Sequence, residues 1–218
     1  MARLAIVEDH ELLAQSLAVA LRDDGFEAHV VVPTSHDDVL DRVEEIAPDI
    51  VLLDLSLGAL GSGVPLIPDL RARGADVICV TGETSQALWG ACIEAGAVSI
   101  MSKTMAFEEL LARIRAVAEG AAAISVSERE ALLAAFRQHR ADERVRIEKY
   151  ERLTNREREV LQGLVNGQSA EQIATASFVS LTTVRTQIRA IFTKLDVGSQ
   201  LAAVALAVRS GWMTPPPE

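Results

Sequence analysis

The stretch Asp49-Ile50-Val51-Leu52-Leu53-Asp54 decides how the first half of this chain folds. Four consecutive apolar residues end on a carboxylate and lead into a loop of small residues that contains Ser56, Gly58, Gly61 and Gly63. A short apolar run between turn signals is typical of a strand that is buried on both faces, as in a parallel sheet. Because ligands bind beyond the carboxyl ends of such strands, Asp54 is either a turn-forming residue or part of a site.

Four similar apolar runs surround this stretch, and each run is followed by a segment with the apolar spacing of a helix. The predicted strands are residues 4–7, 28–32, 49–54, 77–80 and 97–101. The predicted helices are residues 11–24, 37–46, 64–73, 84–95 and 106–119, and Leu12, Leu13, Leu17 and Leu21 are expected to form the apolar stripe of the first. Five strand–helix repeats predict an α/β domain, in which a parallel sheet is covered by helices on both faces.

The composition predicts two soluble modules. The chain has 218 residues, 49% of them apolar and 24% charged, which is ordinary for a folded protein. No apolar run reaches the roughly 20 residues of a membrane span, and the N-terminus lacks a signal-peptide pattern, so a cytoplasmic protein without a membrane partner is expected. Cys79 and Cys92 are interpreted as buried free thiols. Residues 1–120 carry a net charge of −12 and residues 121–218 a net charge of +2, which indicates modules with different partners.

The carboxyl ends of the predicted strands carry a set of chemically related side chains: Glu8 and Asp9, Asp54, Thr81, and Lys103. Clustered carboxylates repel one another unless a cation intervenes, and all-oxygen ligation suits Mg²⁺. An ammonium and a hydroxyl are the groups that a phosphoryl oxygen would need. The pattern therefore predicts attack by the Asp54 carboxylate on a phosphoryl group, which gives an aspartyl phosphate.

This constellation resembles the receiver domain of two-component response regulators, over residues 3 to about 120. The resemblance implies a flavodoxin-like fold with a five-stranded parallel sheet and Asp54 as the phosphoacceptor. It also implies a Mg²⁺ site formed by Glu8, Asp9, Asp54 and the Ser56 backbone carbonyl, and a conformational switch through Thr81 and Lys103. Two positions depart from the family pattern. Met101 stands two residues before the lysine, where an aromatic switch residue is expected, and Thr104 replaces the proline after it, which removes the reason to expect a cis peptide.

A phosphatase of the haloacid-dehalogenase type is an alternative, since it also uses an Asp at a strand end with a Thr or Ser and a Lys. Such enzymes need a second Asp two residues later as general acid and base. Ser56 holds that position here and cannot fill the role at neutral pH. The acidic pair Glu8-Asp9 also comes at the start of the chain instead of late. The chain is therefore not expected to be an enzyme.

Residues 121–150 are predicted to be a helical linker. Ser127 and Glu130 have the spacing of a capping box, and the charged run that follows alternates in sign, as on an exposed helix. Four of six heptad positions counted from Leu133 are apolar, so a short coiled coil is the alternative to a solvated helix.

Residues 151–218 are predicted to form an all-α domain of four helices. Thr154 and Glu157 form a capping box, and Ser169 and Ser180 are expected to cap the next two helices, the first of which is expected to bury Ile173, Ala174 and Phe178. The third helix carries three cations and no acid over residues 180–195, which suits the major groove of double-stranded DNA. Its predicted outward residues are Thr182, Thr183, Arg185, Thr186, Gln187, Arg189 and Lys194.

Several short motifs of this half closely resemble the LuxR-type helix-turn-helix, among them Leu153-Thr154, Glu171-x-Ile173-Ala174, Thr183-Val184-Arg185 and Lys194-Leu195. The resemblance implies a recognition helix at residues 181–195 and a dimerisation helix at residues 199–209 with the seam Leu201, Val204, Ala205 and Val208. Gln187 stands where the family often has His. Residues 215–217 are interpreted as a disordered tail.

Together the halves resemble a response regulator of the NarL/FixJ type. The resemblance implies that a sensor histidine kinase phosphorylates Asp54 and so controls dimerisation and sequence-specific DNA binding, with RNA polymerase as a candidate further partner. The alternative is a DNA-binding regulator that works without phosphate and uses the receiver as a dimerisation platform, for which Met101 is the support.

Overall fold

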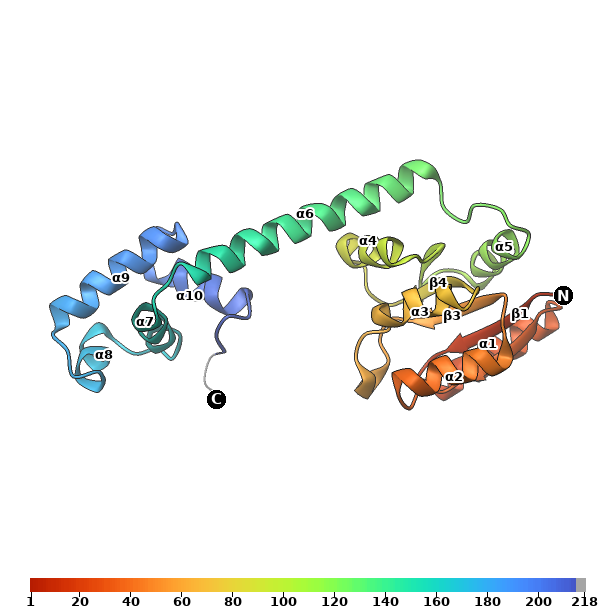
Figure 1. Ribbon diagram of the computed structural model, residues 1–218, viewed down its shortest axis with the longest axis horizontal. Helices are drawn as coiled ribbons and strands as arrows, with labels where there is room; N and C mark the ends of the chain where they lie inside the picture. Colours follow the sequence, from red (N-terminus) through yellow and green to blue (C-terminus); the bar gives the residue numbers. More distant parts are fainter. Residues whose placement is uncertain (215–218) are drawn as a thin grey trace. The chain divides into compact units, whose positions relative to one another are not determined.

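The computed structural model describes residues 1–214, which form two compact units. The first unit is Met1–His139, and the second begins at Arg140. Helix α6 (Val126–Glu151) passes through this boundary, so its first half belongs to the first unit and its second half to the second (Figure 1). Each unit is described by itself below.

The first unit is built on a parallel sheet with the strand order β2-β1-β3-β4-β5. The strands are β1 (Arg3–Val7), β2 (Glu27–Val31), β3 (Ile50–Asp54), β4 (Asp76–Thr81) and β5 (Ser99–Ser102). All five residues of the central strand β3 are buried, which explains its continuous apolar run. The registers align Val7 with Leu53, Asp54 with Val80, and Thr81 with Ser102, so the carboxyl ends of these strands meet at one edge. The predicted five-stranded α/β fold is confirmed.

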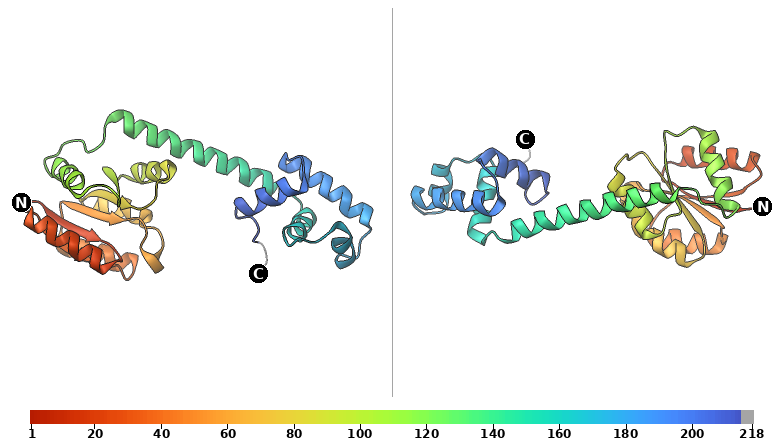
Figure 2. Two further views of the ribbon diagram at one scale, coloured as in Figure 1. Left: turned by 180° about the vertical axis from the view of Figure 1, so that it is seen from behind. Right: turned by 90° about the horizontal axis from the view of Figure 1, so that it is seen from above.

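Helices cover both faces of the sheet (Figure 2). One face packs against α2 (His36–Ile46), α3 (Ile67–Ala72) and α4 (Gln86–Ala95), and the other packs against α1 (Glu11–Asp23) and α5 (Phe107–Ala118). Successive residues of β3 alternate between these layers, because Val51 and Leu53 belong to the first core and Ile50 and Leu52 to the second.

Two helices of the first unit differ from the prediction. The segment expected to be one helix at residues 64–73 begins as a 3₁₀ turn, Val64–Leu66, and becomes α-helical only at Ile67. Pro65 and Pro68 lack amide donors, and a proline also disfavours helical geometry in the residue before it. In α1 the buried residues are Ala14, Ala18 and Leu21, whereas Leu12 is 83% exposed. The prediction that Leu12 faces the core is therefore wrong.

The first half of α6 packs on the first unit, near α4 (Figure 1). Leu132 is buried and belongs to the core that α2, α3 and α4 share, and Leu133 packs against that core. Gly90 of α4 lies against α6, because an added Cβ would lie 2.1 Å from the Leu132 carbonyl oxygen. The start of α6 is capped by Ser125, whose hydroxyl accepts the Glu128 amide at 3.1 Å. A solvated helix does not describe this half of α6, and the cap predicted at Ser127 is wrong.

The second unit contains α7 (Asn155–Val165), α8 (Ala170–Ala176), α9 (Leu181–Leu195) and α10 (Gln200–Arg209) around one apolar core, as predicted. Thr154 with Glu157 and Ser169 with Gln172 form two complete capping boxes, and Ser180 caps α9. The second half of α6 joins this unit through Tyr150, whose ring stacks on Trp212 with centroids 5.0 Å apart.

One prediction about the second unit is wrong. Phe178, expected to be buried together with Ile173 and Ala174, is 97% exposed and has a φ of 54°. In α10 the buried residues are Ala203 and Ala207, whereas Leu201 of the predicted dimerisation seam is 79% exposed and does not belong to the core of this unit. The proline tail lies outside the described residues. Within the described chain no single helix is long and apolar enough to cross a membrane, although the bent pair α9 and α10 together meet that criterion on length and composition.

Candidate functional site

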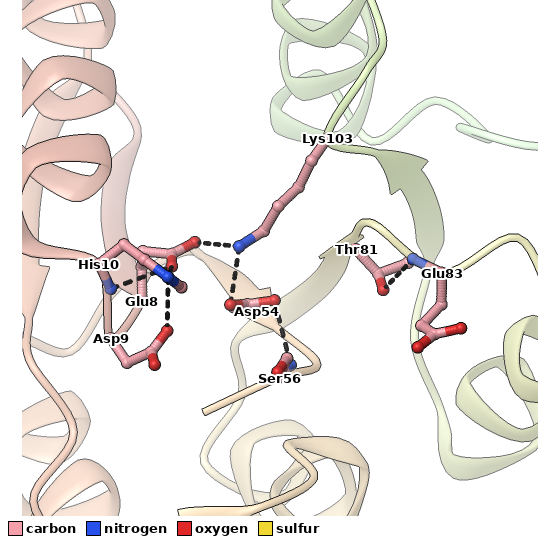
Figure 3. Close-up of polar contacts among 8 residues, drawn as sticks. All are labelled: Glu8, Asp9, His10, Asp54, Ser56, Thr81, Glu83 and Lys103. Carbon is pink, nitrogen blue, oxygen red and sulfur yellow. Dashed lines mark hydrogen bonds and ion pairs between the residues drawn. The ribbon is translucent and has the colours of Figure 1, made fainter. Parts of the chain in front are cut away.

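Three charged side chains meet at the carboxyl edge of the sheet. Glu8 follows β1, Asp54 ends β3, and both residues are buried, while Lys103 follows β5. The Lys103 Nζ lies 2.7 Å from Glu8 Oε2 and 2.8 Å from Asp54 Oδ2, so one ammonium bridges two carboxylates (Figure 3). The Ser56 amide donates to Asp54 Oδ1 at 3.1 Å. Glu8, Asp54 and Lys103, which sequence reasoning assigned to three separate strand ends, are thus brought into direct contact.

The acidic residues of this edge are arranged as a candidate cation site. One ligand atom from each of Glu8, Asp9, His10 and Asp54 lies within 4.8 Å of the others. Asp9 Oδ1 is buried and accepts no hydrogen bond among the described residues, although the His10 Nδ1 lies 2.9 Å from it. Gly58 packs against the same carboxylate, because an added Cβ would lie 2.6 Å from Asp9 Oδ2. A buried, underused carboxylate oxygen among oxygen donors is a suitable environment for a hard cation.

His10 belongs to this cluster although the sequence reasoning did not select it. Its ring Nδ1 lies 2.8 Å from Glu8 Oε1, and its backbone amide donates to the same oxygen at 3.1 Å. The hydrogen bond with Glu8 and the charge of Asp9 raise the pKa of His10. The position of His10 directly after Glu8-Asp9 was the feature of the sequence that could have indicated its place in the cluster.

Burial and Lys103 compete to set the protonation of the two buried carboxylates. Burial raises the pKa of Glu8, but the hydrogen bonds from Lys103 and His10 outweigh it, so the pKa lies below its ordinary value. For Asp54 burial prevails over the hydrogen bonds from Lys103 and the Ser56 amide, and the pKa is raised. Although burial lowers the pKa of Lys103, its hydrogen bonds to Asp54 and Glu8 raise it overall. Asp54 is thus a buried carboxylate whose charge depends on the cations beside it.

Thr81 does not contact Asp54 in this structure. Its Oγ1 accepts the Glu83 amide at 3.0 Å, within its own loop (Figure 3). Among the described residues no peptide bond is cis, in agreement with the expectation at Thr104.

The proposed switch role of Met101 is contradicted by the side of the sheet on which it lies. Met101 is fully buried in the core formed with α1 and α5. Thr81 and Cys79 are two residues apart and therefore share a face, and Cys79 pairs with Ile100 in the other core. Met101 cannot enter a space vacated by Thr81. Ile100 is the β5 residue on the Thr81 face, and sequence reasoning missed it.

The candidate nucleic-acid interface is the outer face of α9. Thr182, Thr183, Arg185, Thr186 and Arg189 are exposed, while Val184, Ile191 and Leu195 are buried. The Arg185 Nη2 makes an exposed contact of 3.3 Å with Glu171 Oε1. The Thr183 hydroxyl bonds to the capping Ser180 at 2.8 Å.

Two residues predicted to point outward from α9 lie at the edge of its buried face. Gln187 is half-buried, and its Oε1 has no hydrogen-bond partner within the described structure. It lies three residues after Val184 and four before Ile191, both of which are buried. The Lys194 Nζ lies 2.6 Å from Glu157 Oε2, so this lysine joins α9 to α7 and is not a freely solvated charge.

The two units match two known families of domains. Residues 4–115 match the family model of the response regulator receiver domain, and residues 151–207 match the model of the bacterial regulatory proteins of the luxR family. This chain is a LuxR-family response regulator.

The response regulator resembles one relative over nearly its whole length and another over about half of it. It is 30% identical to a nitrate/nitrite response regulator protein homolog of Haemophilus influenzae, over 94% of this chain and 95% of that protein. It is 43% identical to the sensory transduction protein RegX3 of Mycobacterium tuberculosis, over 54% of this chain and only 51% of that protein. A structure of the response regulator RcsB in complex with DNA shares the fold, with a TM-score of 0.50, 20% identity, and coverage of 94% of this chain and 96% of that chain.

The family assignment decides between the response regulator and the phosphatase that were considered from the sequence. Response regulators of this family act in two-component systems that regulate transcription, and they are not enzymes of the phosphatase class considered from the sequence. The receiver domain implies a histidine kinase partner, and the luxR-family domain implies binding to DNA.

Proposed function

We propose that Asp54 of this response regulator accepts a phosphoryl group from a sensor histidine kinase and that the phosphorylated form binds its DNA operator more tightly. The observation that carries the proposal is a buried Asp54 at a strand end, bridged to Glu8 by Lys103 at 2.8 and 2.7 Å. A buried carboxylate beside a movable cation suits nucleophilic attack, since the cation can turn to the incoming phosphoryl oxygens.

Mg²⁺ is the expected cofactor. Glu8, Asp9, Asp54 and the Ser56 carbonyl would hold it, and Asp9 Oδ1, which accepts no hydrogen bond among the described residues, supports this assignment. When bound, the ion neutralises charge on the transferring phosphoryl group.

In the proposed transfer, Asp54 takes the phosphoryl group, and Lys103 and Thr81 then change their contacts. A carboxylate oxygen of Asp54 forms a bond to phosphorus as the bond from phosphorus to the kinase histidine nitrogen breaks, and the electron pair leaves with the imidazole. Lys103 then shifts from Asp54 toward the phosphoryl oxygens, because phosphorylation of Asp54 removes the carboxylate charge that held it. Thr81 is expected to turn from the Glu83 amide toward the phosphoryl group as well.

Phosphorylation at Asp54 is tested by intact mass after incubation with Mg²⁺ and acetyl phosphate. Wild type should gain one phosphoryl group, and chelation of Mg²⁺ should prevent the gain. Asp54→Asn should gain none, whereas Asp49→Asn, directly before the opposite end of β3, should behave as wild type. Labelling of Asp54→Asn at the wild-type level would show that another residue is the acceptor.

DNA recognition is proposed to reside on the exposed face of α9, with Arg185 contacting base edges and Arg189 contacting phosphates. Thr182 and Thr186 lie exposed on the same helix, whereas Thr183 and Lys194 make their main contacts within the domain. Residues early in a recognition helix read bases, and Arg185 is the fifth residue of α9.

The base-reading role of Arg185 is tested with a selected operator and a random duplex at fixed salt. Arg185→Ala should weaken operator binding by about 1–3 kcal/mol and weaken random binding much less. Arg189→Ala is the matched comparison, and it should weaken both by a similar factor. An equal loss on both duplexes for Arg185→Ala contradicts base reading.

Phosphorylation is further proposed to favour a homodimer, in the cytoplasm, that meets RNA polymerase at promoters. The exposed Leu201 of α10 supports a dimer seam on that helix. The alternative of a phosphate-independent regulator no longer rests on Met101, which lies on the face of the sheet away from Thr81, but on Ile100, the non-aromatic residue on the Thr81 face.

A further inference from the structure

A cavity of about 230 Å³ lies between α1 and α5, directly beside the phosphoacceptor. Its walls are mainly apolar. The residues of α1 and of the segment around the start of α5 that line it are Leu13, Ala14, Leu17, Met105, Phe107 and Leu110. Glu8, Asp54 and Lys103 form one end of the same cavity, so the cavity reaches the groups that carry the phosphorylation chemistry.

The cavity has both the size and the opening that a small ligand requires. An engineered apolar cavity of about 150 Å³ binds benzene, so a cavity of about 230 Å³ has room for one or two fused rings. Leu13 in the first turn of α1 and Phe107 at the start of α5 are 45% and 39% exposed. Because both side chains line the cavity and also reach solvent, the entrance lies between the two helix starts.

The charges at the inner end select against a charged ligand. Lys103 is already hydrogen-bonded to Glu8 and Asp54, so an anion in the cavity would face two buried carboxylates against one ammonium (Figure 3). A cation would have to lose its hydration against leucine and methionine walls. A neutral ring avoids both costs, and a single N–H or O–H at its edge can donate to a carboxylate oxygen.

We propose that this cavity binds a neutral, mainly apolar compound of one or two rings, with an N–H or O–H donor facing Glu8 or Asp54. An occupant would pack beside Lys103 and hinder its movement away from the two carboxylates. If Asp54 is the phosphoacceptor, the occupant slows phosphorylation. This consequence rests on the proposed function, whereas the binding itself does not.

Binding is measured with the full-length protein, carrying ¹³C-labelled Ile, Leu and Met methyl groups, titrated with indole. The expected result is a saturable shift of the Leu17, Met105 and Leu110 methyl signals. Ala14→Leu adds bulk inside the cavity and should weaken indole binding about tenfold or more. Leu12→Ala is the matched control, because Leu12 is on the same helix, is 83% exposed and does not line the cavity, so it should bind as wild type.

A second variant keeps the test decisive if Ala14→Leu does not fold. Leu17→Ala enlarges the cavity and should bind the larger ring of 2-naphthol more tightly than wild type does. The proposal is wrong if indole produces no saturable shift in wild type, or if both cavity variants bind the probes as wild type does. Acetyl phosphate labelling with and without indole is scored separately, so failed labelling in both conditions rejects the phosphoacceptor assignment and leaves the binding result standing.

Discussion

Replacing Gly90 with alanine should release the first half of α6 from the receiver unit. An added Cβ would lie 2.1 Å from the Leu132 carbonyl oxygen and 2.7 Å from the Phe136 Cβ. Both neighbours belong to the body of a helix and cannot rotate away as the end of a long side chain could. Since carbon and oxygen atoms need a separation of about 3.5 Å, the two helices would have to move apart by about 1.4 Å.

The cost of that separation can be worked from burial. Leu132 is 7% exposed, and re-exposing a buried leucine costs about 1.5–3 kcal/mol. A loss of about 2 kcal/mol lowers the equilibrium constant for docking of α6 about 30-fold. The same substitution improves the helix propensity of α4 by about 1 kcal/mol, so the folded receiver itself should not be weakened.

Hydrogen exchange measured by mass spectrometry separates these two effects. In Gly90→Ala, amides of residues 126–139 should exchange much faster, while the strands of the sheet keep their protection. Glu94→Ala changes an exposed position on the same helix and should leave α6 protected. Unchanged protection of residues 126–139 in Gly90→Ala would refute the close packing of α6 on α4.

Two further predictions concern the DNA-binding unit. Glu157→Gln should destabilise it by about 2 kcal/mol at neutral pH in urea unfolding, because the Glu157 carboxylate accepts from Lys194 and from the Thr154 amide. Although burial raises the pKa of Glu157, these hydrogen bonds lower it overall. The stabilisation by the carboxylate is therefore complete above the unfolded pKa of about 4.3 and is lost as the pH falls through the lower folded pKa. Equal stability of variant and wild type at pH 7 would contradict this prediction. Phe178→Gly should leave the free energy of unfolding unchanged or raise it by up to about 1 kcal/mol, because glycine tolerates a φ of 54° and the ring is 97% exposed. A loss of several kcal/mol would mean that the ring is buried.

The residues of the site could be predicted because the residue that ends each strand can be read directly from the sequence. Each apolar run ends on its polar residue, and parallel topology then brings Glu8, Asp54 and Lys103 to the same edge. The capping boxes at Thr154 and Ser169 are equally local, because all of their partners lie within three residues.

The remaining features depend on register or on contacts distant in sequence. The face on which a strand residue lies changes with a shift of one position, so Met101 and Ile100 could not be told apart from the run of apolar residues alone. The ion pair of Lys194 with Glu157 spans 37 residues. The packing of Leu132 on α4 requires knowing that Gly90 faces α6, which no periodicity within α4 reveals.

The division of α6 between two units limits where this protein can be cut or recombined. A receiver fragment that ends near residue 120 lacks Leu132 and leaves the α4 surface around Gly90 uncovered. An effector fragment that begins at residue 151 lacks Tyr150 and therefore its stacking on Trp212. Chimaeras that exchange effector domains should therefore be joined inside α6 near residue 139, where neither half loses its own packing.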